Sequence, residues 1–421
     1  MKRRLWISVP VLILAGIAVG FLLLAAVYAL PAEPMAANLR ASIPAFNGQW
    51  DSEDSYEQLV EGYITTQLDN STDAAMLLAA VHQSDASPFV QAAEAKRYIA
   101  DGDAWQALMA YGEGEALESV PIARYWHGYL LALKPLLLVM SYMDIRMLLM
   151  LLEGFGLCAV IAGLCRCGLG RLCPAFALSM LAVTPAAAGF SMQFSTAFVI
   201  FLGAMSFLLY APRRWLEGNG LGLFFAVVGI TTSYIDYLTY PIATFGMPFV
   251  LCVFLFPATS VREQIRQFVL CGVCWAAGYL GMWAGKWLLG ALLSSEPWFW
   301  HNLMAKITER SSGEVSSRAI SYLDVLFSVL RPFCKRAYLL VGVLAGLVWA
   351  GGCIRRRRIS LPALPQTLAL IFAALLPFGW YLFTMNHTYN HAFFTSRGVC
   401  VAFFAVGCTL FSLLDRTEKA E

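Results

Sequence analysis

Apolar segments long enough to cross a bilayer recur along this chain, separated by short polar stretches. A helix needs about 20 apolar residues to cross the hydrocarbon core, where each backbone N–H and C=O must be satisfied within the protein. The chain is 59% hydrophobic and only 13% charged, unlike typical soluble domains. The sequence therefore predicts an all-α, polytopic membrane protein with about ten spans, at residues 5–30, 145–165, 172–188, 192–211, 219–233, 241–257, 267–291, 338–353, 361–384 and 398–414.

The positions of the basic residues predict the orientation, because Lys and Arg of short loops stay in the cytoplasm. The first span follows Lys2-Arg3-Arg4 and is too long for a signal peptide, so we interpret it as a retained signal anchor. The loop at 31–123 contains fifteen acidic and three basic residues, as expected of an extracytoplasmic segment. We expect a plasma-membrane protein with both termini in the cytoplasm. The other predicted cytoplasmic basic residues are Arg166, Arg171, Arg213, Arg214, Arg262, Arg266, the run at 355–358, Arg416 and Lys419.

The loop at 31–123 is too long for a simple connector, and helix-like patterns recur within it. The segments SYEQLVEGYITTQL and DAAMLLAAVH predict a small helical subdomain. In LDNSTD, residues 68–73, Asp69 or Ser71 is a candidate N-cap. Asp73 would then occupy the first turn, where the macrodipole favours a carboxylate. A catalytic role is the alternative for either acid.

Polar residues are concentrated near the predicted outer ends of the later spans. Ionisable groups at membrane depth are costly and usually line a functional cavity. Lys286 either belongs to such a cavity or extends toward the headgroups. The two most polar segments are TTSYIDYLTYP at 231–241, with Asp236, and NHTYNHAFFTSR at 386–397, with His387, His391 and Arg397.

The segment after the outer loop begins ARYWHGYLLALKPLLLVMSYMDIR at Ala123. Its apolar stretch, 129–143, is too short to span, and a polar break at 144–146 leads into a true span. This order resembles the GT-C superfamily of integral-membrane glycosyltransferases. Those enzymes have one span, an outer loop with a catalytic acid, and then a surface helix. The chain also resembles multi-pass membrane proteins of Gram-positive gut bacteria.

The predicted spans and the outer loop divide the chain into four parts, and the resemblance implies a reaction. The parts are a signal-anchor span (1–30), an acidic helical loop domain (31–123), a juxtamembrane helix (124–144) and a nine-span membrane domain (145–421). The implied reaction moves a sugar from a polyprenyl-phosphate donor to an extracytoplasmic acceptor, either an envelope polysaccharide or a glycolipid. In those enzymes the catalytic acid comes soon after the first span, whereas here the first acidic cluster, at 51–54, comes about 20 residues later.

Three kinds of residue would perform this chemistry. A carboxylate must accept the proton of the acceptor hydroxyl, cations must neutralise the departing phosphate, and aromatic rings would stack on the sugar. The candidate bases, in order of preference, are Asp69, Asp73 and Asp236. The candidate phosphate ligands are Arg397, then His387, His391 and Lys286. The candidate sugar-binding residues are His127, Tyr125 and Trp126, for which an interfacial aromatic belt is the alternative.

The sequence assigns no cofactor and no metal-binding motif. The acidic outer loops suit Mg²⁺ or Mn²⁺, but no ligand spacing requires either. Cys271-Gly-Val-Cys274 has zinc-like spacing, yet it lies within a predicted span without a second ligand pair, so we expect buried apolar cysteines. The basic run at 355–358 indicates anionic lipid contact, and nucleic acid is not an expected partner.

Three other functions remain compatible with the sequence. A transporter or lipid-sugar flippase would place polar residues near the bilayer midplane, usually in inverted repeats, and no repeat is evident. A polysaccharide polymerase or ligase shares the outer-face chemistry and differs in its acceptor. A non-catalytic sensor or scaffold would use residues 31–123 as a binding module, and would tolerate neutralisation of Asp69 or Arg397.

Overall fold

The computed structural model describes residues 2–50, 56–355 and 363–413 of the chain. The acidic cluster at 51–54, most of the basic run at 355–358, and both Arg416 and Lys419 lie outside the described residues. Within the described part the fold is helical, with two antiparallel ribbons of two strands each. One pairs β1 (Arg97–Ile99) with β2 (Glu118–Val120), and the other pairs β3 (Glu314–Val315) with β4 (Arg318–Ala319).

Long apolar helices confirm an all-α, multi-pass architecture. Within the described residues, seven helices are long and apolar enough to cross a membrane. They comprise α1 (Lys2–Tyr28), α7 (Tyr142–Arg166), α10 (Met192–Tyr210), α13 (Val261–Leu293), α16 (Arg336–Arg355), α17 (Leu364–Phe383) and the segment Ala392–Ser412, which ends in α20 (Cys400–Ser412). Three shorter apolar helices coincide with the other predicted spans: α8 (Cys173–Val183), α11 (Gly220–Ile235) and α12 (Ile242–Leu255).

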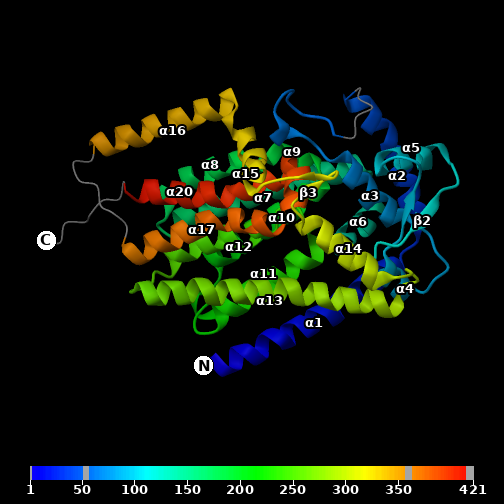
Figure 1. Ribbon diagram of the computed structural model, residues 1–421, viewed down its shortest axis with the longest axis horizontal. Coiled ribbons are helices and arrows are strands. Elements are labelled where there is room, and N and C mark those ends of the chain that lie inside the picture. The colour runs from blue at the N-terminus through cyan, green and yellow to red at the C-terminus, as the bar shows by residue number, and fades with distance from the viewer. Residues whose placement is uncertain (1, 51–55, 356–362, 414–421) are drawn as a thin grey trace.

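The residues after α1 form a separate layer on one end of the bundle. They fold into α2 (Ala32–Trp50), η1 (Ile64–Thr66), α3 (Asn70–Val81), α4 (Pro88–Glu94) and α5 (Ala104–Glu113). In Figure 1 these helices gather at the right-hand end, whereas α20, the last described helix, lies toward the left. We call the end that this layer covers the capped end, and the layer itself the loop domain. Of the two segments predicted to be helical, DAAMLLAAVH lies in α3 and its C-cap, as expected. The prediction for SYEQLVEGYITTQL, residues 55–68, is wrong: its described part contains only η1 and an isolated bridge between Gln58 and Gln67.

The juxtamembrane segment is shorter than expected. We predicted one helix over 124–144, but α6 spans only Leu130–Leu137, and α7 already begins at Tyr142. Ser141 caps α7: its hydroxyl accepts from the Asp144 N–H, and the Asp144 carboxylate accepts from Ser141 in return. A capping box of this kind starts a helix, so the polar break belongs to the span itself.

Two regions differ from the predicted spans. The segment at 172–188 is broken at Thr184, whose φ of +52° ends α8 before the short helix α9 (Pro185–Phe190). The long connection after α13 contains α14 (Phe299–Ser311), the β3–β4 ribbon, α15 (Tyr322–Leu330) and η4 (Arg331–Cys334). Neither feature follows from hydropathy alone, because both depend on local capping and on packing against the bundle.

Glycines allow the closest helix pair to form. A Cβ added at Gly229 of α11 would lie 2.1 Å from the Trp275 carbonyl oxygen of α13. At Gly278 of α13, an added Cβ would lie 2.2 Å from the Ala226 carbonyl oxygen. Small residues let membrane helices approach in this way.

Candidate functional site

Asp69 is the N-cap of α3, as predicted, and its carboxylate is buried. Its oxygens accept from the Thr72 N–H at 2.8 Å and from the Thr72 hydroxyl at 2.9 Å. The residue is 3% exposed and forms no ion pair within the described part of the chain. Burial raises the pKa of Asp69 to about 7, although the bonds from Thr72 oppose this shift. A carboxylate that titrates near neutrality is suited to general base catalysis.

Asp73 differs from Asp69 in its hydrogen bonds, because its carboxylate oxygens have partners in several other elements. Burial raises the pKa of this carboxyl, which is fully enclosed between α3, α7 and the start of α10. Such contacts are typical of a structural anchor and favour Asp69 as the base. The partners are the Tyr142 hydroxyl (2.6 Å), the Met192 and Gln193 N–H groups (3.0 and 3.1 Å), the Ser191 hydroxyl (3.4 Å) and the Arg146 guanidinium (3.6 Å).

Asp236 shapes the turn between α11 and α12. Its carboxylate accepts from the Thr196 hydroxyl at 2.9 Å and from both the N–H and the hydroxyl of Thr239. Burial raises the pKa of Asp236 to about 6. Within this turn Leu238 has a φ of +62°, an unusual conformation for a branched residue, and such strain often occurs at functional sites. The turn directs Tyr237 toward the loop domain.

Tyr237 lies in an aromatic cluster at the capped end. Its ring centre is 4.7 Å from that of Tyr125 and 5.6 Å from that of His127. Burial lowers the pKa of His127 to about 3, and its ring nitrogens lie within hydrogen-bonding distance of Tyr129 Oη and the Ile122 carbonyl. His127 is thus an uncharged part of the cluster near neutral pH.

Trp126 does not join this cluster. Its indole N–H donates to the Met282 carbonyl of α13 at 2.7 Å, and its ring packs 5.4 Å from that of Tyr234. The three residues predicted to hold a sugar therefore separate: Tyr125 and His127 line one region, and Trp126 packs into the bundle. His127, directly after Trp126, has a positive φ of +56°.

Three arginines from distant parts of the sequence surround the aromatic cluster. The Cζ atoms of Arg124 and Arg310 lie 5.2 and 5.4 Å from the centre of the Tyr125 ring. Burial raises the pKa of the nearby Tyr237 hydroxyl, and the positive charges of Arg97, Arg124 and Arg310 oppose this rise. None of the three forms an ion pair among the described residues, and the Nε atoms of Arg97 and Arg124 are buried without a hydrogen-bond partner. Like charges brought together around one ring favour a bound anion.

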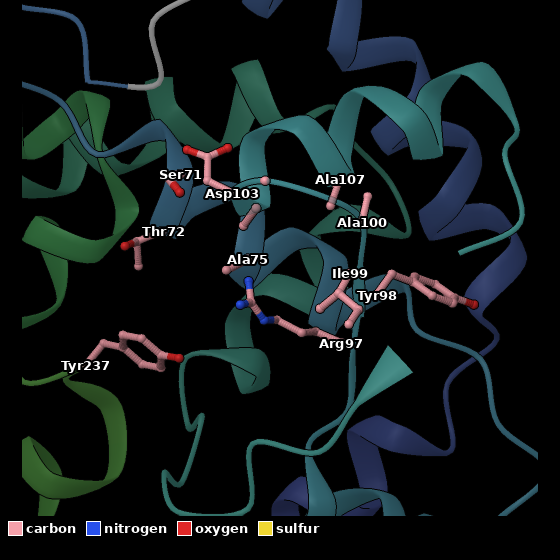
Figure 2. A pocket seen from close by; sticks show the side chains of 12 residues that line it. Ser71, Thr72, Ala75, Arg97, Tyr98, Ile99, Ala100, Asp103, Ala107 and Tyr237 are labelled. Carbon is pink, nitrogen blue, oxygen red and sulfur yellow. The ribbon is translucent and has the colours of Figure 1, made fainter. Parts of the chain in front are cut away.

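A polar cavity of about 280 Å³ lies between Arg97, the one arginine of this cluster that lines it, and the start of α3. The N-terminal ends of α3 and α5, strand β1 and the Tyr237 turn line it. Figure 2 shows the Arg97 guanidinium and the Tyr237 hydroxyl pointing toward each other across this space. Thr72 lines the same cavity and is the residue that donates both hydrogen bonds to Asp69. The Asp69 carboxylate therefore lies directly behind the cavity wall.

The histidines of the segment at 386–397 form a neutral wall next to Arg310. The His387 and His391 rings are 4.9 Å apart, and His387 Nε2 is 3.0 Å from the Leu238 carbonyl oxygen. Burial and then the charge of Arg310 lower the pKa of both, that of His391 to about 4. These rings are uncharged near neutral pH, so Arg310, rather than either histidine, supplies positive charge here.

Arg397 and Lys286 contact the loop domain and do not line the polar cavity. Arg397 is fully buried and donates to the carbonyls of Phe393 (2.6 Å) and Thr65 (3.1 Å). Lys286 donates to the carbonyls of Ala92 and Ala93, the C-terminal residues of α4, at 2.9 and 2.8 Å. It is 1% exposed, so the interpretation that it extends to the headgroups is wrong. Both cations fix the loop domain to the bundle.

Lys134 and Arg146 make the same kind of contact and were not predicted. Lys134, which is buried in α6, donates to the Ala80 carbonyl near the C-terminus of α3 at 2.6 Å. Arg146 donates to the Asn70 side chain at 2.8 Å, at the other end of that helix. Their only sequence signal was position, since each is a lone cation within an apolar segment.

Two of the three arginines around the aromatic cluster had a weak sequence signal. Arg97 is one of three basic residues in an acidic loop, and Arg124 directly precedes the predicted aromatic motif. Arg310 had none. Among the described residues, no three His, Cys, Asp or Glu side chains are grouped as a metal site would require, and all cysteines are free.

Comparison with known proteins returned no match. No family model, no curated protein and no solved structure resembles the chain closely enough to count as one. The function must therefore be argued from the residues at the capped end.

Proposed function

We propose that this protein transfers a sugar from a polyprenyl-phosphate carrier to an acceptor at its capped end, which we expect to face outward. The observation that carries the proposal is the pairing of Asp69 with the cavity beside it. A buried carboxylate without an ionic partner lies behind the wall of a cavity that Arg97 enters. Two more arginines, neither of which forms an ion pair among the described residues, lie around the same aromatic cluster.

The proposed reaction needs one base and one anion site. The acceptor hydroxyl oxygen attacks the anomeric carbon, and the bond between that carbon and the phosphate oxygen breaks. The electron pair leaves with the polyprenyl phosphate, and the hydroxyl proton passes to Asp69, whose pKa of about 7 suits this role. Arg97, Arg124 and Arg310 would neutralise the departing phosphate, as planar guanidinium groups do with two oxygens at once.

The aromatic cluster would hold the sugar between these two groups. Tyr125 and Tyr237 present ring faces and hydroxyl groups, and His127 is neutral, so the cluster offers stacking and hydrogen bonds without additional charge. A polymerase or ligase would use the same groups and differ only in its acceptor. The transferase, polymerase and ligase reactions would share one proposed ligand, the polyprenyl phosphate.

Binding of undecaprenyl phosphate by the detergent-solubilised, full-length protein tests the proposal. We expect Arg97→Gln to weaken binding by about tenfold or more, since a hydrogen bond to a charged group contributes about 1.5–3 kcal/mol. Arg40→Gln is the matched control, because Arg40 is an exposed cation of the loop domain that contacts Tyr111 and not the cavity. Equal affinities for the wild type and Arg97→Gln would contradict the proposed anion site.

A further inference from the structure

A second cavity lies between α16 and the rest of the bundle. It has a volume of about 590 Å³ and is lined by residues of α8, α16, α17 and α20. None of its lining residues is charged, and none is shared with the polar cavity at the capped end. In Figure 1, α16 runs along the upper edge of the molecule, apart from the packed helices. We call this space the α16 groove.

Among the described residues, two side-chain hydrogen bonds join α16 to the rest of the protein, one in its first turn and one at Trp349, closer to its other end. Toward the capped end, the Tyr338 and Thr65 hydroxyls lie 2.5 Å apart. Toward the other end, the Trp349 indole N–H donates to the Leu410 carbonyl at 2.8 Å. Between them, none of the most apolar part of the helix is buried within the protein. The groove therefore has fixed ends and an open, apolar middle.

Between Tyr338 and Trp349, the residues of α16 that line the groove are small. Gly342, Ala345 and Gly346 occupy one face, and no heavy atom lies within 4 Å of a Cβ built at either glycine. Small residues at such spacing usually bring membrane helices into direct contact. Here they leave space, and in a bilayer an apolar space open to the side is filled by hydrocarbon.

Positive charge surrounds the entrance of the groove near the capped end. Arg331, Lys335 and Arg336 are exposed at the turn between α15 and α16, and none forms an ion pair within the described residues. Leu330 and Phe333, in the same turn, line the groove itself. Basic residues of membrane proteins are usually concentrated in cytoplasmic loops, whereas we expect this basic cluster to lie on the extracytoplasmic side. An anionic group above an apolar chain would match both features.

We propose that the α16 groove binds an anionic phospholipid of the outer leaflet. One acyl chain occupies the groove, and the phosphate contacts Arg331, Lys335 and Arg336. The lipid would hold α16 in place and, through the Tyr338–Thr65 hydrogen bond, support η1, the segment that leads to Asp69. This site does not depend on the sugar-transfer proposal, since the two cavities have no residue in common.

Native mass spectrometry of the full-length protein in detergent tests this proposal, with phosphatidylglycerol and phosphatidylcholine of identical chains as probes. We expect phosphatidylglycerol to bind more tightly. Because each cation near a lipid phosphate contributes about 1 kcal/mol, the triple variant R331Q/K335Q/R336Q should lose about a hundredfold in affinity. Arg318→Gln, an exposed arginine of strand β4 outside the groove lining, is the matched control.

Gly346→Leu tests the chain-binding part separately. The added side chain meets no neighbouring atom at its Cβ, so the fold should be kept while the groove is filled, and phosphatidylglycerol binding should fall. Equal binding of both lipids, or unchanged binding in Gly346→Leu and in the triple variant, would overturn the proposal. So would tighter binding of undecaprenyl phosphate that displaces phosphatidylglycerol, or a dimer that Gly346→Leu abolishes.

Discussion

Two sets of charged residues lie at the capped end, and they differ in what they contact. The partnered set, namely Asp73, Lys134, Arg146, Lys286 and Arg397, binds main-chain or side-chain groups that join the loop domain to the bundle. The open set, namely Asp69, Arg97, Arg124 and Arg310, forms no ion pair and no hydrogen bond between the loop domain and the bundle in the described part of the chain, and it lies at or near the polar cavity.

The comparison shows that burial alone does not identify a functional charge. Asp69 and Asp73 are one helical turn apart and both are buried, yet Asp73 accepts from four donors in two other helices and their connections, whereas Asp69 accepts only from Thr72. A charge that the protein has already paired contributes to stability, while one left unpaired is available to a ligand. The following predictions test this division.

The largest effect should come from exchanging the two neighbouring acids for their amides. We expect Asp69→Asn to lower sugar transfer by about a hundredfold or more, the usual contribution of a general base, while the melting temperature changes little because Asn is an equally good N-cap. We expect Asp73→Asn to lower the free energy of unfolding by about 3 kcal/mol, since it breaks a buried charged network. Transfer of label from radiolabelled undecaprenyl-phosphate hexoses and thermal unfolding measure the two outcomes.

The pH profile provides the control for this pair. With a pKa of about 7, Asp69 loses its proton as the pH rises through 7, so transfer should increase up to about pH 7 and then level off. Because the folded-state pKa is raised, the contribution of Asp69 to stability is present at low pH and is lost as the pH rises toward 7; Asp69→Asn should remove that loss. Transfer that is flat across this range would exclude Asp69 as the base.

An intermediate effect should follow from removing a partnered cation. Lys286→Met leaves the Ala92 and Ala93 carbonyls buried without their donor, and we expect a loss of about 1–3 kcal/mol in the free energy of unfolding. Below the melting temperature, undecaprenyl phosphate should bind as tightly as to the wild type. Weaker binding of undecaprenyl phosphate with an unchanged melting temperature would show that Lys286 contributes to ligand binding, so that it belongs to the open set.

The smallest effect should come from the histidine wall. His391 is uncharged near neutral pH, so we expect His391→Gln to change the affinity for undecaprenyl phosphate by no more than about twofold. Titration of both proteins near pH 7 provides the measurement. A tenfold loss would show that the histidine ring contacts the phosphate directly, and the division between charged and neutral residues at this site would need revision.

Several local features were predictable because neighbouring residues alone produce them. Asp69 caps α3 since its side chain needs only the Thr72 N–H, three residues ahead. Helix α3 followed from its local pattern, and the long apolar helices from hydropathy, whereas the pattern at 55–68 gave only η1. The role of Lys286 was not predictable, because its acceptors belong to α4, nearly two hundred residues earlier in the chain. Trp126 was predicted to bind sugar together with Tyr125 and His127, and this grouping was wrong for the same reason: its hydrogen-bond acceptor, Met282, lies far away in the sequence, in α13.

By itself, the sequence determined that the chain folds into long apolar helices with a helical domain between the first two, because run length and backbone hydrogen bonding depend only on adjacent residues. It also determined which side chains carry charge. Only the tertiary structure decided which of those charges are satisfied. It brings carbonyls of the loop domain onto Lys286 and Arg397, and leaves Asp69, Arg97, Arg124 and Arg310 without ionic partners among the described residues. Whether a buried charge has a partner depends on contacts between distant segments, and these exist only once the helices have packed.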